Sequence, residues 1–418
     1  MKDLRFPPNA EALPAYRASS AEYRKTKDPE KRLEARRALF RARRQVVAAF
    51  SQATLRRALN ERDDIDEPLV WFWFNHFNVF WLKDLVGAAL PDYVDGVIRP
   101  RMTGRFRDLL LGVMTHPAML VYLDNSRNVA GRINENYARE LLELHTLGVN
   151  GGYTQADVQE VARVLTGFGL RPLQPVRWTE KQAAQMREQG EFLFDPRRHD
   201  FGDKRVLGRT IAGAGYAELE TLADMLSRQP ATARHLCGKL CLFLVGEDAP
   251  RDMVEQAAKV YMDTDGDLAK VVADIRRQAG RLAVRPRTFK DPYRWVITSV
   301  SLLAASRPVD NTQPVERWLV ALGEPLFGRS TPDGYSLRGS DWVGAGQLTQ
   351  RFELARELVA TAPRLLDGPL EVDRVLASGP ARALQASLGP ASRAALDKAE
   401  AGEDKLALLI SSPEFMYW

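Results

Sequence analysis

The chain has 418 residues, 45% hydrophobic and 27% charged, a balance that excludes an intrinsically disordered polypeptide and allows a large buried core. No segment approaches the roughly 20 apolar residues that a membrane-spanning helix needs, and residues 1–30 lack the apolar centre of an export signal. We expect a globular protein without a transmembrane segment, cytoplasmic as the chain is written and exported if a signal segment precedes it.

The net charge of +5 is concentrated at the N-terminus, where residues 1–50 hold 13 Lys and Arg against 6 Asp and Glu. Apolar residues at helical spacing among the arginines of residues 30–50 predict an amphipathic helix. A solvated helix is the simplest interpretation, and an anionic partner such as a membrane surface is the alternative. Nucleic acid is a further anionic partner of this kind, although aromatic and basic residues do not alternate here, which counts against the binding of a single strand. We treat residues 1–62 as a basic helical N-terminal segment.

Helical periodicity continues through most of the chain. Helices are predicted over 30–60, 66–90, 103–124, 130–148, 155–166, 216–246, 250–278, 290–306, 314–322, 346–362 and 370–410. Residues 191–194 and 204–211 are instead typical of two short strands joined by a polar loop. Residues 323–342, rich in Gly, Pro and Ser, predict an ordered loop that packs aromatic side chains against the body. The expected fold is mainly α, a multi-helical bundle in which residues 63–418 form one domain with a small β-hairpin near 191–211.

Two features that could suggest metal binding have simpler interpretations. Cys237 and Cys241 lie at helical i,i+4 spacing, which does not favour disulfide geometry. We expect buried thiols, with a two-cysteine metal or redox site as the alternative. The acidic run at 262–274 lacks the glycine and glutamate positions of a calcium loop. It predicts a turn in which Asp265 or Asp267 caps the following helix.

The segment NENYARELLELHTLG carries the most information. On a regular helix Asn136, Arg139, Glu140 and Glu143 share one polar stripe, whereas His145 points to the opposite side. A salt-bridged surface is one interpretation, because Arg139 has a glutamate four residues away on each side. The alternative is that an amide and two carboxylates face a cleft, where they shift each other's pKa or hold a divalent cation. One straight helix cannot place both glutamates and His145 on the same metal.

Among the five histidines, His199 is the leading functional candidate. It lies in the polar loop between the two predicted strands, immediately before Asp200, and such loops often carry reactive groups. The alternative is a loop histidine that fixes the hairpin. His76, in the aromatic cluster WFWFNHFNVFW, is either a hydrogen-bonded core residue or a ligand. His116, before Pro117, predicts the end of one helix and the start of the next.

Several of these segments together resemble the domain-of-unknown-function 1800 (DUF1800) family of bacteria. The matching motifs are WFNHFNVF, HPAMLVYLDN, NENYARELLELHTLG with GYT and LTG after it, HDFGDKRVLG, ARHLCGKLCLFLV and SPEF, which extend from about residue 66 to the end. The resemblance implies a protein without an assigned activity. It also implies additional N-terminal sequence, often with an export signal, whereas this chain starts late with a basic segment. A protein of the sulfatase- and phosphatase-like DUF1501 family is implied as a partner, by analogy.

Two hypotheses about function follow. In the first, Glu140, Glu143, His199 and Asp200 are catalytic groups of a hydrolase that uses acid–base chemistry or a divalent metal held by Glu140, Glu143, His76 and His199. It requires these residues to converge in space. In the second, the chain is a non-catalytic helical scaffold or partner protein, which predicts glutamates paired with arginines and an exposed apolar patch. The sequence indicates neither the substrate nor the oligomeric state.

Overall fold

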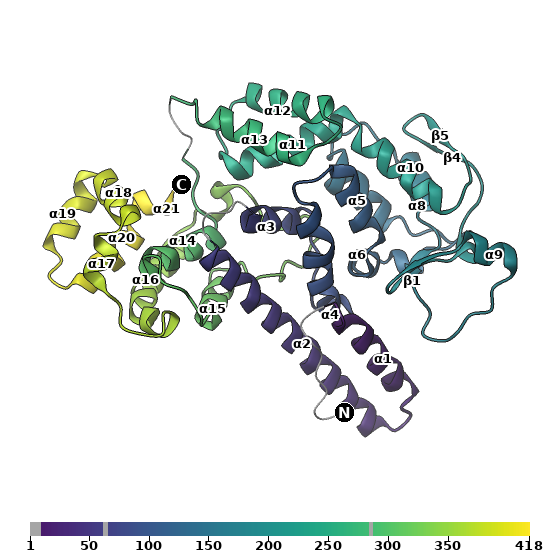
Figure 1. Ribbon diagram of the computed structural model, residues 1–418, viewed down its shortest axis with the longest axis horizontal. Helices are drawn as coiled ribbons and strands as arrows, with labels where there is room; N and C mark the ends of the chain where they lie inside the picture. Colours follow the sequence, from purple (N-terminus) through teal and green to yellow (C-terminus); the bar gives the residue numbers. More distant parts are fainter. Residues whose placement is uncertain (1–9, 62–65, 284–286) are drawn as a thin grey trace.

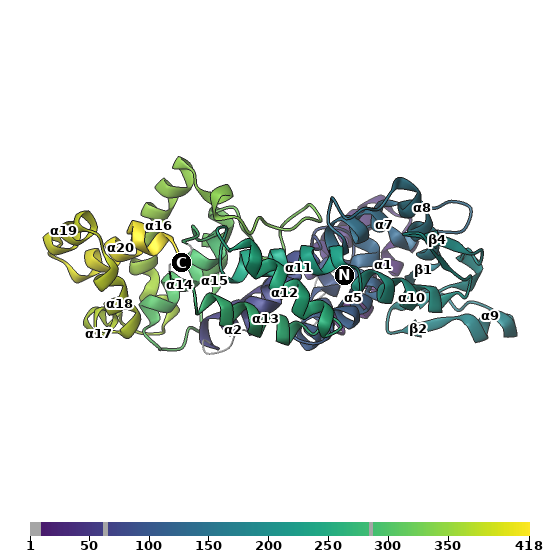
Figure 2. The ribbon, with the colours of Figure 1, turned by 90° about the horizontal axis from the view of Figure 1, so that it is seen from above.

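The computed structural model describes residues 10–61, 66–283 and 287–418, and its helices and strands are arranged in an elongated molecule (Figure 1). Helices hold 64% of the chain and strands 5%, which confirms the prediction of a mainly α fold. Within the described ranges no helix is long and apolar enough to cross a membrane. Helices α16 to α20 lie at one end of the molecule, and α7 to α9 lie at the other (Figure 2).

The α-helices before residue 165 include α3, which carries the aromatic cluster around His76. They are α1 (Ala12–Lys25), α2 (Pro29–Asn60), α3 (Asp66–His76), α4 (Val86–Pro91), α5 (Phe106–Thr115), α6 (Pro117–Tyr122), α7 (Asn136–Glu140) and α8 (Gln155–Val164). Two π-helical segments, η1 (Asp92–Ile98) and η4 (Leu141–Thr146), continue α4 and α7. Short 3-10 turns are η2 (Arg99–Arg101), η3 (Asn125–Arg127), η5 (Pro196–Arg198) and η6 (Gly339–Trp342).

The rest of the chain adds a series of helical hairpins and a lobe of short helices. They are α9 (Glu180–Gln185), α10 (Tyr216–Ser227), α11 (Pro230–Leu244), α12 (Arg251–Asp263), α13 (Leu268–Ala279), α14 (Pro292–Ala304), α15 (Gln313–Ala321), α16 (Ala345–Leu365), α17 (Val372–Leu376), α18 (Gly379–Ser387), α19 (Pro390–Lys398), α20 (Gly402–Ser411) and α21 (Pro413–Met416). The periodicity of 370–410 predicted one region of helix, which the structure divides into four helices.

The basic N-terminal segment is built into the body of the protein. Asp28 caps α2 by accepting a hydrogen bond from the backbone of Lys31 at 3.0 Å, and apolar side chains of α2 belong to the main core. Phe50, for example, stacks on Phe327 with ring centroids 5.5 Å apart. The predicted amphipathic helix therefore exists, and its apolar face packs against the remainder of the chain. The part of this segment before residue 10 lies outside the described residues.

The strands form two small antiparallel sheets, and their pairing corrects the predicted hairpin. β3 (Phe192–Phe194) lies between β1 (Phe168–Leu170) and β2 (Arg187–Gln189). β4 (Lys204–Val206) pairs instead with β5 (Arg209–Ile211). The strand positions at 191–194 and 204–211 were predicted correctly, but they do not pair with each other. Leu207 and Gly208, with φ of 49° and 76°, form a tight turn that folds residues 204–211 back on themselves.

Several local predictions are confirmed. His116 ends α5 and caps α6, accepting a hydrogen bond from the backbone of Ala118 at 3.1 Å. Asp267 caps α13, and both cysteines are free and buried. The loop at 323–342 packs against the body through Tyr335, whose ring lies 6.4 Å from that of Trp71.

Candidate functional site

Three of the sequence motifs meet at the C-terminal end of the π-helix η4. His76 of α3 donates from Nε2 to the carbonyl of His145 at 3.1 Å, and His235 of α11 donates from Nε2 to the carbonyl of Leu144 at 3.0 Å. A carbonyl oxygen only accepts, so Nε2 of each ring carries the proton and Nδ1 is left as an acceptor. A helix leaves its last carbonyls without intrahelical donors. The two imidazoles therefore satisfy the end of η4 and join α3, η4 and α11.

Lys239, one turn after His235 on α11, lies at the centre of this junction. Its amine donates a hydrogen bond to Nδ1 of His76 at 3.0 Å. Burial lowers the pKa of Lys239 to about 8 from its ordinary 10.5, although the side chain stays partly exposed. Within the described ranges it has this one hydrogen bond and no ion pair, whereas an ammonium group has three donors. Lys239 therefore retains donors for another molecule.

His145 is a core residue. It is buried, neither ring nitrogen has a hydrogen-bond partner among the described residues, and burial lowers its pKa to about 3. Its ring centroid lies 5.1 Å from that of Phe77 and 6.4 Å from that of Tyr137. A neutral imidazole in aromatic surroundings contributes packing, and the ring's lowered pKa disfavours proton transfer near neutral pH.

The loop after α15 brings a carboxylate to the same region. The Asn75 side chain donates to the carbonyl of Tyr335 at 2.8 Å and accepts from its backbone N–H at 2.7 Å. Asn78 donates to the carbonyls of Arg329 and Thr331 at 3.0 and 2.8 Å. The loop carrying Asp333 is therefore clamped by the two asparagines of the WFNHFNVF motif.

Asp333 and Glu140 have pKa values that move in opposite directions. Burial alone would raise the pKa of Asp333, but hydrogen bonds from Thr331 and Arg329 outweigh it and lower the pKa. Burial, the charge of Glu143 and the charge of Asp333 all raise the pKa of Glu140. Glu140 has no hydrogen bond or ion pair within the described ranges.

Asp333 also links these carboxylates to Lys239. The charge of Asp333 acts on the pKa values of both Lys239 and Glu140. A carboxyl group with a raised pKa, a carboxylate with a lowered pKa and the Lys239 amine thus influence one another electrostatically. Environments that separate the pKa values of two carboxyl groups are typical of acid–base sites.

The other residues of the predicted polar stripe are engaged in holding the fold. Arg139 pairs with Glu135 at 3.5 Å and donates to Gln155 at 2.7 Å. Asn136 donates to the carbonyl of Leu123 at 3.1 Å. Glu143 accepts a hydrogen bond from the Tyr153 hydroxyl at 3.1 Å. Asn136, Arg139 and Glu143 therefore form hydrogen bonds or ion pairs with neighbouring segments.

His199 and Asp200 lie in a separate, closed network. His199 contacts the carbonyl of Thr166 through Nδ1 at 2.7 Å and the Glu218 carboxylate through Nε2 at 2.9 Å. Glu218 also binds Lys204, and all three side chains are buried. These contacts tie the loop before β4 to α8 and α10.

Asp200 does not orient His199. Its carboxylate forms hydrogen bonds with Arg163 at 2.8 and 3.1 Å. Chiefly because of this pairing, the pKa of Asp200 falls to about 2. The contacts of His199 and Asp200 are those of residues that fix a loop, which was the alternative interpretation of this histidine.

The structure does not assemble the predicted metal site. Among the described residues no group of three or more His, Cys, Asp or Glu side chains is placed to hold a metal ion, so Glu140, Glu143, His76 and His199 do not form one. The two histidines are unsuitable as metal ligands because their ring nitrogens already have partners. Those of His76 bind a carbonyl and Lys239, and those of His199 bind Thr166 and Glu218.

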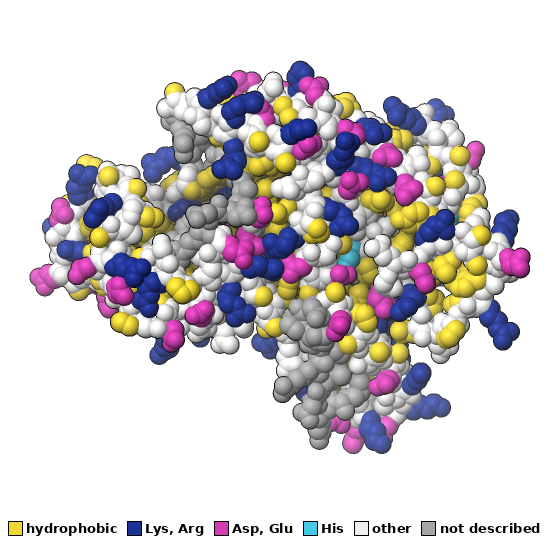
Figure 3. All heavy atoms as spheres, in the orientation of Figure 1, with side chains coloured by type: hydrophobic (Ala, Val, Ile, Leu, Met, Phe, Trp, Pro, Cys, Tyr) yellow, Lys and Arg dark blue, Asp and Glu magenta, His cyan; other side chains and the backbone are white. Residues whose placement is uncertain are grey.

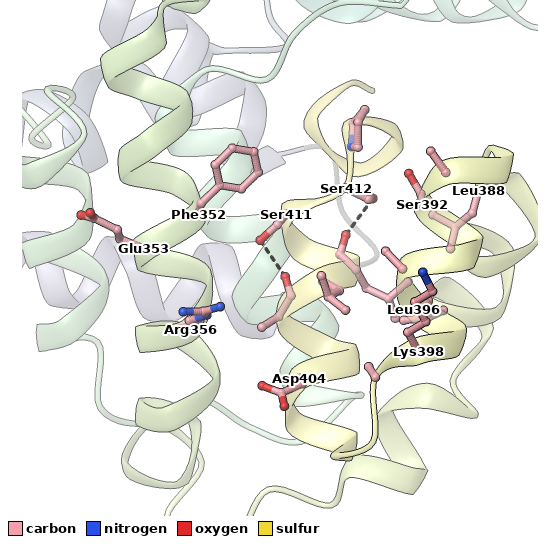
Figure 4. A pocket seen from close by; sticks show the side chains of 17 residues that line it. Phe352, Glu353, Arg356, Leu388, Ser392, Leu396, Lys398, Asp404, Ser411 and Ser412 are labelled. Carbon is pink, nitrogen blue, oxygen red and sulfur yellow. Dashed lines mark hydrogen bonds between the residues drawn. The ribbon is translucent and has the colours of Figure 1, made fainter.

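An open groove of about 810 Å³ lies in the C-terminal lobe, between α16, α19 and α20. Phe352 and Arg356 of α16 point toward α20, whereas Glu353 points away (Figure 4). This lobe lies at the opposite end of the molecule from α7 (Figure 2). Cationic and anionic side chains are interspersed over the face in Figure 3, which shows no extended region of one sign.

Two residues of this site were missed by the sequence interpretation. Lys239 is the one cation in the apolar stretch LCGKLCLFLV, which also contains the two cysteines. Asp333 precedes a glycine in a segment interpreted as a packing loop. A charged residue on the buried face of an apolar helix is a usable signal, because such a position is costly without a partner. Asp333 had no comparable signal.

Comparisons with known proteins identify a family. The model of a family described as "Protein of unknown function (DUF1800)" matches residues 4–417. The match therefore begins well before residue 66, where the recognised motifs start, and includes the basic N-terminal segment. The curated proteins gave no match, and neither did the solved structures.

Proposed function

Because the chain belongs to the DUF1800 family, whose description assigns no reaction, we propose from its geometry that it is an acid–base enzyme, most simply a hydrolase. The observation that carries the proposal is the partly buried Lys239 amine, held by His76 where three motifs meet. Glu140 is the proton donor and Asp333 the ionised base. Lys239 stabilises negative charge that develops on the substrate. His76 is a positioning residue, since it acts through Lys239.

A purely structural role explains this arrangement less well. A partly buried ammonium group without an ion pair costs stability, and Leu or Met would fill the same volume of α11 without that cost. Glu140 likewise has a raised pKa and no partner among the described residues. Costly polar groups gathered at one place are typical of functional sites.

The experiment is a comparison of variants on a substrate panel. Nitrophenyl esters, phosphates and glycosides are offered to the unmodified protein and to Lys239→Met, Glu140→Gln and Asp333→Asn. The matched control is Asp341→Asn, in the same loop. For any substrate that is turned over, we expect each of the three variants to lose about 100-fold or more in kcat and the control to retain activity. Equal activity in all variants would refute the assignment.

A second function, that of a partner-binding protein, is favoured by the open groove in the C-terminal lobe. Its lining includes Phe352 and Leu408, which are 50% and 37% exposed, and exposed apolar side chains are typical of protein-binding surfaces. The DUF1501-type partner implied by the family resemblance is the natural candidate. Co-purification of the two proteins tests this, with Phe352→Asp as the variant expected to abolish it.

A further inference from the structure

Two adjoining hollows lie along α1. The first, of about 350 Å³, lies between α1 and α2 and includes Tyr23, Arg36 and Arg43 in its lining. The second, of about 340 Å³, is lined by residues of α1, α6, η3, β1, η5 and the turn before α4. Arg24 and Asp84 line both hollows, so the two lie side by side. Each has a volume within the range of small-molecule sites.

The lining of these hollows has an excess of positive charge. Lys83 and Asp124 neutralise each other through an ion pair at 2.9 Å. The remaining charged side chains of the lining are Arg24, Arg36, Arg43, Arg127, Arg198 and Asp84. None of these six makes an ion pair within the described ranges. The lining therefore contains five arginines without an ion pair, of which Arg24, Arg36 and Arg127 are exposed, and one carboxylate.

Arg43 is the most informative of them, because it carries its charge into the interior. Its exposed fraction is 8%. Its guanidinium group bonds to the backbone carbonyl of Asp84 and to the Tyr16 side chain and lies over the rings of Phe40 and Trp81, but it has no ion pair, and Nε has no partner, among the described residues. A buried charge without a counter-ion is costly. An anion in the first hollow would compensate it.

Arg198 has the same character in the second hollow. It is half-buried, and it donates to the carbonyl of Ser126 at 2.8 Å. Burial and the nearby charges of Arg197 and Arg132 lower its pKa, against the opposing effect of Asp195. Arg127 lies beside it in the lining and is exposed. Two guanidinium groups without carboxylates can bind one oxyanion by bidentate hydrogen bonds.

We propose that these two hollows bind a small ligand carrying two or more phosphate groups. The charge balance favours phosphate over carboxylate. Five arginines and one aspartate give the lining a net positive charge. A phosphate ester carries about −1.5 to −2 at neutral pH, so two phosphate groups can neutralise this charge. Two carboxylates would neutralise only about half of it. The proposal concerns binding and does not rest on the acid–base chemistry proposed for Glu140, Asp333 and Lys239.

Isothermal titration calorimetry with inorganic tripolyphosphate, at pH 7.5 and 150 mM NaCl, tests the proposal on the full chain. We expect saturable binding of one tripolyphosphate per chain. Arg127→Gln and Arg198→Gln should each weaken binding about tenfold, as expected for loss of one charge-assisted contact. The matched control is Arg364→Gln, which removes an exposed arginine of α16, in the C-terminal lobe.

Further titrations distinguish phosphate ligands from carboxylate ligands and from nucleic acid. Citrate, with three carboxylates, should bind at least tenfold more weakly than tripolyphosphate. Arg43→Gln should also weaken binding, and if it fails to fold the two outer variants decide the result. Absence of saturable binding, an equal loss in Arg364→Gln, equal affinity for citrate, or tighter binding of a single-stranded oligonucleotide would each overturn the proposal.

Discussion

The amine of Lys239 and Nδ1 of His76 lie 3.0 Å apart, in a hydrogen bond between α11 and α3. The opposite nitrogen of the same ring donates to the carbonyl of His145 at the end of η4. The tautomer of His76 is thereby set by a carbonyl, which leaves its other nitrogen free to hold a lysine amine. The His76 ring therefore links the end of η4 to Lys239, the cation of the proposed site.

If Lys239 serves function at the expense of stability, Lys239→Met should raise the free energy of unfolding at pH 7 by about 2 kcal/mol, which is the penalty for the lowered lysine pKa less the cost of leaving Nδ1 of His76 without a donor. The Lys239 pKa of about 8 in the folded chain lies below the ordinary 10.5, so between these values the unfolded chain binds more protons and stability rises with pH. Below pH 8 the full penalty applies. The gain of the variant should therefore shrink as pH approaches 10, which urea unfolding at pH 7 and 10 measures.

The matched control is Lys204→Met. Lys204 is buried in an ion pair with Glu218, so its removal leaves a buried carboxylate without that partner. We expect a loss of about 3–5 kcal/mol at pH 7. Destabilisation by Lys239→Met of the same size would show that Lys239 is structural in the same sense as Lys204.

Glu143 should set the pH dependence of any acid–base reaction at Glu140. The charge of Glu143 raises the pKa of Glu140, and Glu143→Gln removes that charge. If Glu140 is the proton donor, activity falls as pH rises through its pKa, and this falling limb should move to lower pH in the variant. A pH–rate profile of kcat measures the shift. An unchanged profile, or loss of activity at every pH, would contradict a tuning role.

Glu218 should make the fold sensitive to acid. Burial would raise its pKa, but hydrogen bonds from His199 and Lys204 outweigh it and lower the pKa. The stability from this carboxylate is therefore present above its ordinary pKa near 4.5 and is lost as pH falls through the lower, folded value. Glu218→Gln should cost about 3 kcal/mol at pH 7 and much less at pH 3. Equal losses at both pH values, from urea unfolding, would contradict this.

The sequence predicted the parts of the molecule that depend on local pattern. Helical periodicity, the caps at His116 and Asp267 and the loop that packs Tyr335 all depend on near neighbours in the chain. The pairing of β3 with β1 and β2 could not be predicted, because the polar loop after β3 suggested the wrong partner. The family resemblance was confirmed, although the match starts earlier than its recognised motifs.

The candidate site was harder to predict, because its parts are far apart in sequence. Glu140 was identified from its helical stripe. Its relationship to Asp333, almost 200 residues later, depends on a loop held by Asn75 and Asn78, and no pattern in the sequence reports these hydrogen bonds. His199 was a candidate because of its polar loop, yet its hydrogen-bond partners, Thr166 and Glu218, come from other segments of the chain and hold the ring in the interior.

The clamp between Asn75 and the Asp333 loop can be broken at a single glycine. Gly334 has φ of +76°, and a Cβ at this position would lie 2.2 Å from the carbonyl oxygen of Asn75. Gly334→Ala should therefore release the loop and displace Asp333, while the helical body stays folded. Hydrogen exchange should show faster exchange confined to residues 328–342, together with loss of any activity that depends on Asp333.

Gly323→Ala is the matched control for this variant. Gly323 also has a positive φ, +84°, but a Cβ there would meet nothing within 4 Å. Its cost should be the conformational strain alone, about 1 kcal/mol, without release of the loop. If both variants exchange alike at 328–342, strain rather than the contact with Asn75 controls the loop. If neither loosens it, the asparagine clamp does not position Asp333, and the carboxylate loses its place in the proposed site.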